Sequence, residues 1–166
     1  MLKKIINTPQ PKEFNPFDTE KKIVRVTKEA ILRGRGFRRA VLEAYDYKCS
    51  VCGIQINSPN SLVWEVEAAH IVPHSYSGKD NILNGLALCR LHHWAFDVGW
   101  FTIKDNFQVK VSSKIHSLPA EYGKIGKHDV FRSLLDNSAK LLLPIKSNIY
   151  PHQNSIRWHR EHIFHD

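Results

Sequence analysis

Residues 64–98 read WEVEAAHIVPHSYSGKDNILNGLALCRLHHWAFDV, and the patterns in this stretch predict a small unit of secondary structure. The apolar run 63–72 is typical of a strand, and the polar segment 73–85 that follows it is typical of a loop. A short apolar run at 86–88 indicates a second strand, and the apolar residues of LHHWAFD (91–97) suit one face of a helix. The order that we predict is strand, loop, strand, helix.

The polar residues of this unit have the spacing of a metal site. His93 and Asp97 are four residues apart, so on a helix they share one face and can hold a single cation. His70 lies near the end of the first predicted strand, where a hairpin can present it beside that cation. A neutral imidazole close to a metal ion can deprotonate a water for attack on a phosphodiester. The Asn84 side chain can bond the loop backbone and hold the hairpin at its working width.

The three cysteines fall in two short motifs, Cys49-x-x-Cys52 and Cys89-x-x-His92. Four ligands at this spacing fit a tetrahedral, structural Zn²⁺ ion. Because their number is odd, the cysteines cannot all pair in internal disulfides. One alternative is a set of three buried free thiols in a reducing cell. A redox role for the first motif is disfavoured, since no βαβ pattern surrounds it.

At these residues the chain resembles the HNH endonucleases, a family of nucleases with a ββα-metal site. The segment AHIVPHS (69–75) is similar to the first histidine block of the family, NGLALC (84–89) to its asparagine block, and HHWAFD (92–97) to its final histidine block. The resemblance is greatest to restriction endonucleases of this family. It extends from about Phe37 to the C-terminal WHREHIF (158–164).

The resemblance implies a role for each matched residue. His70 would be the general base, Asn84 the residue that stabilises the loop, and His93 a ligand of the catalytic metal ion. Asp97 stands where colicin nucleases place another metal-binding histidine. Relatives often carry two C-x-x-C pairs, and His92 stands where the fourth of those cysteines would be. Taken singly, such residues are more often structural than functional, so the functional interpretation depends on the whole spaced set.

One position departs from the family pattern. Many HNH enzymes have a further metal ligand directly before the catalytic histidine, and here that position is Ala69. Glu67 precedes it by two residues, lies on the same face of the predicted strand and has a longer reach. We therefore expect Glu67 to be the substitute ligand of the catalytic ion.

The chain is basic, with a formal net charge of +8 over 166 residues. An excess of lysine and arginine favours a polyanionic partner, although a charge cluster is usually just a solvated face. Beside a nuclease motif, we expect the densest cluster to contact phosphates of DNA. Its members are Arg33, Arg35, Arg38 and Arg39. Gly34 and Gly36 are expected to interrupt any helix there, so that a separate helix begins at Phe37.

The length fits one domain with a short appended arm. We expect an extended N-terminal arm at 1–26 and a nuclease domain at 27–166, with its core motif at 49–98. The chain has no apolar run near the ~20 residues that a membrane helix needs, and its first residues do not resemble a signal peptide. We therefore expect a cytoplasmic protein without a membrane partner.

The predicted fold class is α+β: a ββα-metal core with a zinc knuckle, flanking helices and a small C-terminal hairpin and helix. The expected activity is metal-dependent hydrolysis of phosphodiester bonds in DNA, with Mg²⁺ or Mn²⁺ as the catalytic ion and Zn²⁺ as the structural ion. We expect a restriction or defence context, with specificity supplied by a separate protein. Two alternatives stay open: a catalytically inactive, zinc-stabilised DNA-binding module, and a nuclease that cleaves RNA.

Overall fold

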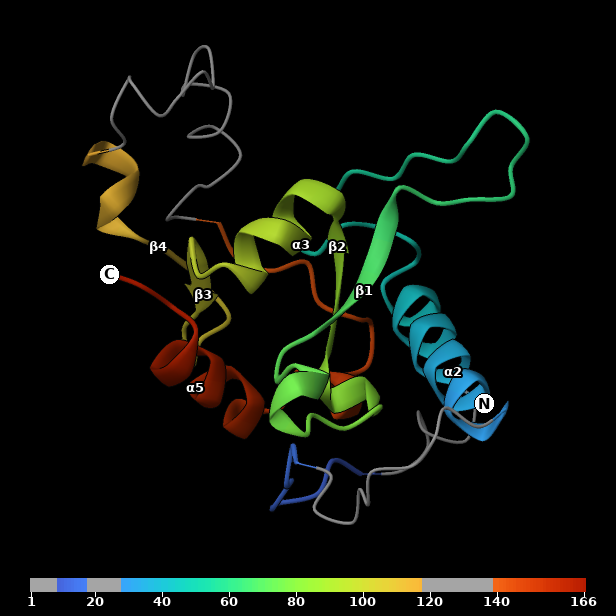
Figure 1. Ribbon diagram of the computed structural model, residues 1–166, viewed down its shortest axis with the longest axis horizontal. Helices are drawn as coiled ribbons and strands as arrows, with labels where there is room; N and C mark the ends of the chain where they lie inside the picture. Colours follow the sequence, from blue (N-terminus) through green and yellow to red (C-terminus); the bar gives the residue numbers. More distant parts are fainter. Residues whose placement is uncertain (1–8, 18–27, 118–138) are drawn as a thin grey trace.

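The computed structural model describes residues 9–17, 28–117 and 139–166 of the chain (Figure 1). The structure is α+β, as the sequence predicted, with short antiparallel strand pairs and helices around them. In chain order its helices and strands are α2 (Lys28–Ala44), β1 (Val66–His70), β2 (Gly85–Cys89), α3 (Arg90–Asp97), β3 (Phe101–Ile103), β4 (Val109–Val111) and α5 (Gln153–His162). Within the described ranges, no helix has the length and apolar character needed to cross a membrane.

The centre of the molecule is the antiparallel hairpin of β1 and β2. Its register pairs Val66 with Cys89 at one end and His70 with Gly85 at the other. Both α2 and α3 pack against this hairpin, and Figure 1 shows the two helices on either side of it. A Cβ atom on Gly85 would lie 2.5 Å from a methyl carbon of Val41, so the glycine lets α2 approach β2 closely.

Helix α2 corrects one expectation from the sequence. It runs without interruption through Gly34 and Gly36, where we had predicted a break. Each glycine in a helix costs ~1 kcal/mol relative to alanine. Phe37 and Val41 are buried against the hairpin, and burial of one such side chain contributes about 1.5–3 kcal/mol. Tertiary packing of the helix therefore outweighs the local cost of its glycines.

The small C-terminal hairpin predicted from the sequence is present. β3 and β4 are antiparallel, with Phe101 paired to Val111, and α5 packs against β3. One core joins this C-terminal part to the central hairpin. Its largest fully buried apolar side chains come from α2, β1 and the residue after it, β2, α3, β3 and α5: Val41, Val66, Ile71, Leu86, Leu88, Phe96, Phe101, Ile103 and Ile156.

The described part of the N-terminal arm, residues 9–17, contains no helix and packs onto the domain. The Phe14 side chain is buried, and its carbonyl accepts a hydrogen bond from Nδ2 of Asn154 in α5 at 2.9 Å. Phe17 forms a bridge with Gly78 in the loop after β1. The rest of the predicted arm, 1–8 and 18–26, lies outside the described residues, so the boundary after residue 26 stays a prediction.

Candidate functional site

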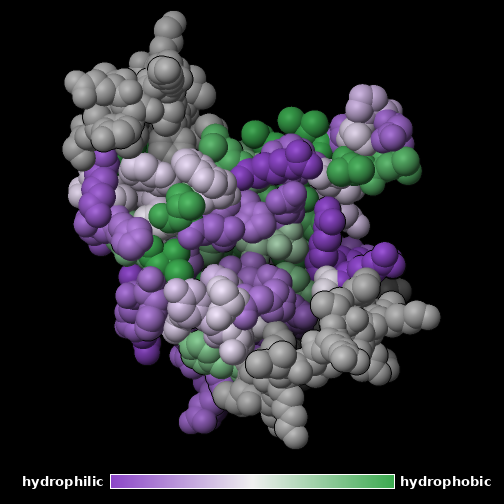
Figure 2. Space-filling model, viewed as in Figure 1, coloured by the Kyte–Doolittle hydropathy of each residue, from purple (hydrophilic) through white to green (hydrophobic). Residues whose placement is uncertain are grey.

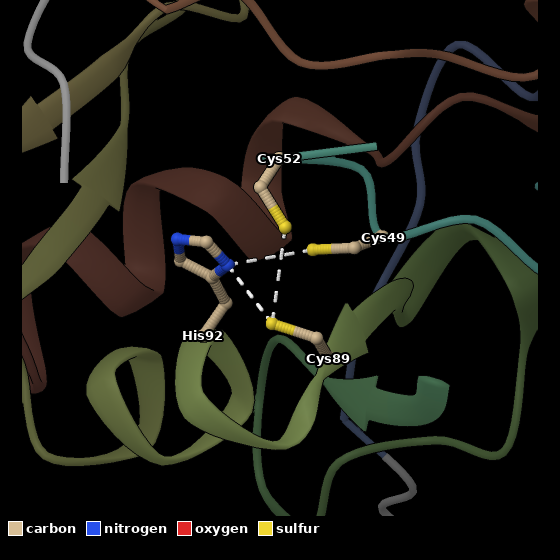
Figure 3. Close-up of side chains that lie close together, drawn as sticks. All are labelled: Cys49, Cys52, Cys89 and His92. Carbon is tan, nitrogen blue, oxygen red and sulfur yellow. Dashed lines mark hydrogen bonds between the residues drawn. The ribbon is translucent and has the colours of Figure 1, made fainter. Parts of the chain in front are cut away.

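The four residues predicted to bind zinc converge from three parts of the chain (Figure 3). Cys49 and Cys52 lie in the turn after α2, Cys89 ends β2, and His92 lies in the first turn of α3. The Cys89 Sγ atom is 3.1 Å from His92 Nδ1 and 3.9 Å from Cys52 Sγ, and Cys49 Sγ is 3.5 Å from His92 Nδ1. All four ligand atoms lie within 4.8 Å of one another. With a Zn–S bond of ~2.3 Å, such separations suit the corners of a tetrahedral site.

Backbone hydrogen bonds hold the turn that carries Cys49 and Cys52 against β2. Gly53 has a φ of 73°, which suits glycine, and its N–H donates to the Cys49 carbonyl at 2.9 Å to close the turn. The N–H of Ser50 donates to Ala87 at 2.7 Å and ties the turn to β2. Side-chain hydrogen bonds from Cys52 and Cys89 lower the pKa of the Cys49 thiol.

A second group forms around His93 on the face of the hairpin that α3 covers. The His93 Nδ1 atom is 3.0 Å from a carboxylate oxygen of Glu67, and Nε2 is 3.5 Å from a carboxylate oxygen of Asp97. Arg90 lies 3.6 Å from the other oxygen of Glu67. Burial raises the pKa of Asp97, and the nearby His93 opposes that rise. The two carboxylates predicted from the sequence therefore flank opposite nitrogens of one imidazole.

A third group surrounds His70 at the end of β1. Its Nε2 atom is 2.9 Å from Oδ1 of Asp80, and Nε2 of His74 is 2.9 Å from the same oxygen. The His70 ring stacks on Phe37 of α2, with a centroid distance of 4.0 Å and an interplanar angle of 16°. Asp80 and His74 were not among the predicted site residues. The sequence contained a signal for His74, because it follows His70 by only four residues. It contained none for Asp80, which only the path of the loop brings back to β1.

These two histidine groups lie on different faces of β1. Glu67 contacts α3 through His93, whereas His70 contacts α2 through Phe37. Residues three apart on a strand point to opposite faces, so this separation follows from the strand itself. Among the described residues, the potential metal ligands that share a group with His70 are His74 and Asp80, and His93 is not one of them.

Asn84 is fully buried and bonds the loop backbone as the sequence predicted. Its Oδ1 accepts from the Val72 N–H at 2.9 Å, and its Nδ2 donates to the carbonyls of Val72 and Lys79, both at 3.1 Å. These bonds close the segment between β1 and β2 and thereby set where His70 and Asp80 meet. The importance of Asn84 for activity stays a prediction.

The predicted basic cluster lies on α2. The side chains of Arg35, Arg38 and Arg39 are exposed, and Arg39 forms an ion pair with Glu43 at 2.6 Å. The side chain of Arg33 lies outside the described part of the structure. The three described arginines point away from the hairpin, because their neighbours Phe37, Ala40 and Val41 are buried against it.

Comparison with known proteins assigns the central segment to a family. Residues 49–104, which contain the cysteine motifs, the hairpin and α3, match the model of the HNH endonuclease family. The match confirms the resemblance to HNH endonucleases that the motifs of this segment predicted. No curated protein matches the chain.

One similar solved structure is a modification dependent TagI restriction endonuclease. It superposes with a TM-score of 0.54 and 23% sequence identity, over 77% of this chain and 37% of that chain. At this identity the likeness shows a shared fold. The matched region spans little more than a third of the TagI chain.

Proposed function

We propose that this protein is a divalent-metal-dependent endonuclease that hydrolyses phosphodiester bonds in DNA. The observation that carries the proposal is the arrangement within the HNH segment, where one strand bears His70 at its end and Glu67 against His93 of α3. The proposal is supported because β1 carries both a histidine suited to be a base and a carboxylate that, with His93 of α3, forms a pair suited to hold a cation.

The proposed ligands of the catalytic ion are His93 and Asp97. A bound Mg²⁺ or Mn²⁺ ion would neutralise charge on the phosphate that is attacked. The Nε2 atom of His93 faces Asp97, so Nδ1–H is left to donate to Glu67. Glu67, expected from the sequence as a direct ligand, is then better suited to orient the His93 ring, as carboxylates beside metal-binding histidines commonly do.

His70 is the proposed general base. The contact between its Nε2 atom and Asp80 holds the imidazole in position to accept a proton from water. The Asp80 carboxylate also stabilises the imidazolium that forms, which makes Asp80 a positioning residue for the reaction. The stacked Phe37 ring holds the plane of the imidazole. Asn84 supports both groups by closing the loop between them.

A structural Zn²⁺ ion is the proposed occupant of the Cys49, Cys52, Cys89 and His92 cluster. The cluster joins the end of α2 to the start of α3. A zinc ion there would fix both helices relative to the hairpin, and its binding would contribute to folding. Cys49, Cys89 and His92 are buried, which agrees with a structural ion that has no open coordination position.

Nicking of supercoiled plasmid tests the proposal. The purified protein should convert the plasmid to nicked or linear DNA with Mg²⁺ or Mn²⁺, and conversion should stop in EDTA. Ni²⁺ serves as a third metal for comparison. Absence of cleavage with every metal, together with retained DNA binding, would favour the catalytically inactive module instead. Faster cleavage of RNA than of DNA, measured with both labelled substrates in one reaction, would favour the RNA nuclease.

A restriction or defence role is the proposed biological context. It is supported by the fold that the chain shares with a restriction endonuclease. We propose that sequence selection comes from a separate specificity or defence protein and that the enzyme acts on DNA in the cytoplasm. Cleavage of unrelated plasmids at many sites by the protein alone would agree with this, whereas a single defined cleavage site would contradict it.

A further inference from the structure

The segment between the cysteine turn and β1 forms a projecting loop, residues 54–65 (Figure 1). This loop exposes large aliphatic side chains: Leu62 is 78% exposed, Ile56 56% and Val63 50%. Figure 2 shows the corresponding apolar surface on the projection at the upper right. Contiguous exposed apolar residues on a soluble domain often mark a binding surface.

The loop is ordered by its own hydrogen bonds. The N–H of Ser58 donates to the Val63 carbonyl at 2.8 Å, and the N–H of Glu65 donates to the Ile56 carbonyl at 2.9 Å. The hydroxyl of Ser58 accepts from the Val63 N–H at 3.0 Å. At the base of the loop, the Trp64 ring stacks on Tyr47 with centroids 4.9 Å apart. The tip therefore presents its aliphatic side chains in a set geometry, which lowers the entropy cost of binding a partner.

The loop and the arginines of α2 line one open surface cavity of about 400 Å³. Leu62, Val63 and Trp64 line one side of it. The other lining residues are Arg35, Arg38, Arg39, Leu42 and Tyr47. The lining contains three guanidinium groups and no carboxylate, although Glu43 pairs with Arg39 from the helix. Within the described residues, Arg35 and Arg38 have no carboxylate partner, so their charges are available to a polyanion.

We propose that this surface binds duplex DNA, with the arginines on backbone phosphates and Leu62 inserted into a groove as an apolar wedge. The inference rests on the proposed function and adds the interface and the manner of binding. Proteins that bend DNA combine basic side chains with aliphatic residues that partly unstack a base step, and this surface places both kinds of group around one cavity. The positive charge of the arginines favours DNA, a polyanion, as the partner of this surface over a protein with an apolar face.

The test measures binding of a duplex oligonucleotide carrying 2-aminopurine, in EDTA so that no cleavage occurs. Leu62→Ser should weaken binding about tenfold and remove the fluorescence rise that unstacking produces, because a buried leucine contact is lost. The affinity of Leu62→Ser for DNA should depend on salt concentration in the same way as that of the unsubstituted protein. Arg38→Gln should instead reduce the slope of log affinity against log salt by ~0.9, the effect of one lost phosphate contact.

Ile145→Ser is the matched control, since Ile145 is 100% exposed and does not line this cavity. It should bind DNA and raise the fluorescence as the unsubstituted protein does. If Leu62→Ser behaves like this control, the wedge is wrong, and an unchanged salt slope in Arg38→Gln would exclude the phosphate contact. Plasmid nicking reports separately on the nuclease, so a protein that nicks but shows no Leu62 effect refutes only the wedge. A protein that shows this effect but never nicks refutes only the nuclease.

Discussion

The His70 side chain is held by more contacts than an exposed surface histidine usually makes. Phe37 stacks on its ring, Asp80 bonds its Nε2 atom, and its side chain is half-buried at the end of β1. A group held in this way loses little entropy when it meets a substrate, which is what general-base catalysis requires. The contacts also tie its ring orientation to Asp80, a residue outside the three family motifs.

His70→Ala should lower the rate of plasmid nicking by about 10²–10⁴-fold, because the proposed base is removed. Zinc content and melting temperature should stay close to those of the unsubstituted protein. Asp80→Asn should give a smaller loss, because the amide oxygen still accepts the Nε2–H bond but the carboxylate charge is gone. Asp80→Glu should recover part of the rate. A His70→Ala protein that nicks at a near-normal rate would contradict the assignment.

At the scale of elements, one strand and one helix distribute the site residues. β1 alternates its faces, so Glu67 meets α3 while His70 meets α2. α3 separates its adjacent histidines, because successive helical positions point about 100° apart. His92 faces the cysteines, and His93 faces Glu67. The two proposed ions therefore bind to different sides of the same short helix.

The matched pair His92→Ala and His93→Ala tests this division. His92→Ala should lose zinc and at least ~2 kcal/mol of unfolding free energy, because zinc binding is coupled to folding. His92→Cys should restore both by supplying another zinc ligand. His93→Ala should keep its zinc and its melting temperature but lose plasmid nicking. Metal analysis, thermal unfolding and the nicking assay report these outcomes. An unsubstituted protein without zinc, or identical behaviour of the two alanine variants, would refute the division.

On the scale of the whole molecule, α5 attaches the C-terminal segment to the nuclease core through a buried histidine. The His159 ring stacks on Phe96 of α3 with a centroid distance of 3.6 Å. Its Nε2–H donates to the Phe96 carbonyl, and Nδ1 accepts from the Thr102 hydroxyl, both at 3.0 Å. This pattern requires the neutral ring, and burial lowers the pKa of His159 to about 3.

The shifted pKa of His159 makes stability depend on pH. Between its ordinary value of about 6.5 and about 3, the unfolded chain binds the proton and the folded protein does not. Stability should therefore fall as pH falls through this window, by up to ~1.4 kcal/mol per pH unit from this residue. Urea unfolding at several pH values should show the advantage of the unsubstituted protein over His159→Gln shrinking with acid. An advantage that stays constant with pH would contradict this.

The sequence by itself predicted the strands and helices of the core, and the side-chain groups whose members are brought together by local residue spacing. A continuous apolar run predicted β1, apolar residues on one helical face predicted α3, and the pair His93 and Asp97 followed from the helix alone. The cysteine motifs predicted a contact across many residues, because Cys49 and Cys89 belong to motifs that one tetrahedral ion explains together. The buried amide of Asn84 was also anticipated, since an asparagine in such a loop can bond the backbone on both sides.

Only the tertiary structure decided the remaining features. The path of the loop after β1 brings Asp80 to His70, and packing on the hairpin keeps α2 continuous through Gly34 and Gly36. The shared cavity of Leu62 and the arginines likewise joins segments that no local pattern connects. Local patterns report backbone geometry over a few residues, which the chain itself determines. These contacts instead depend on the free energy gained by burying apolar surface between several elements. That free energy is gained only when the elements pack together.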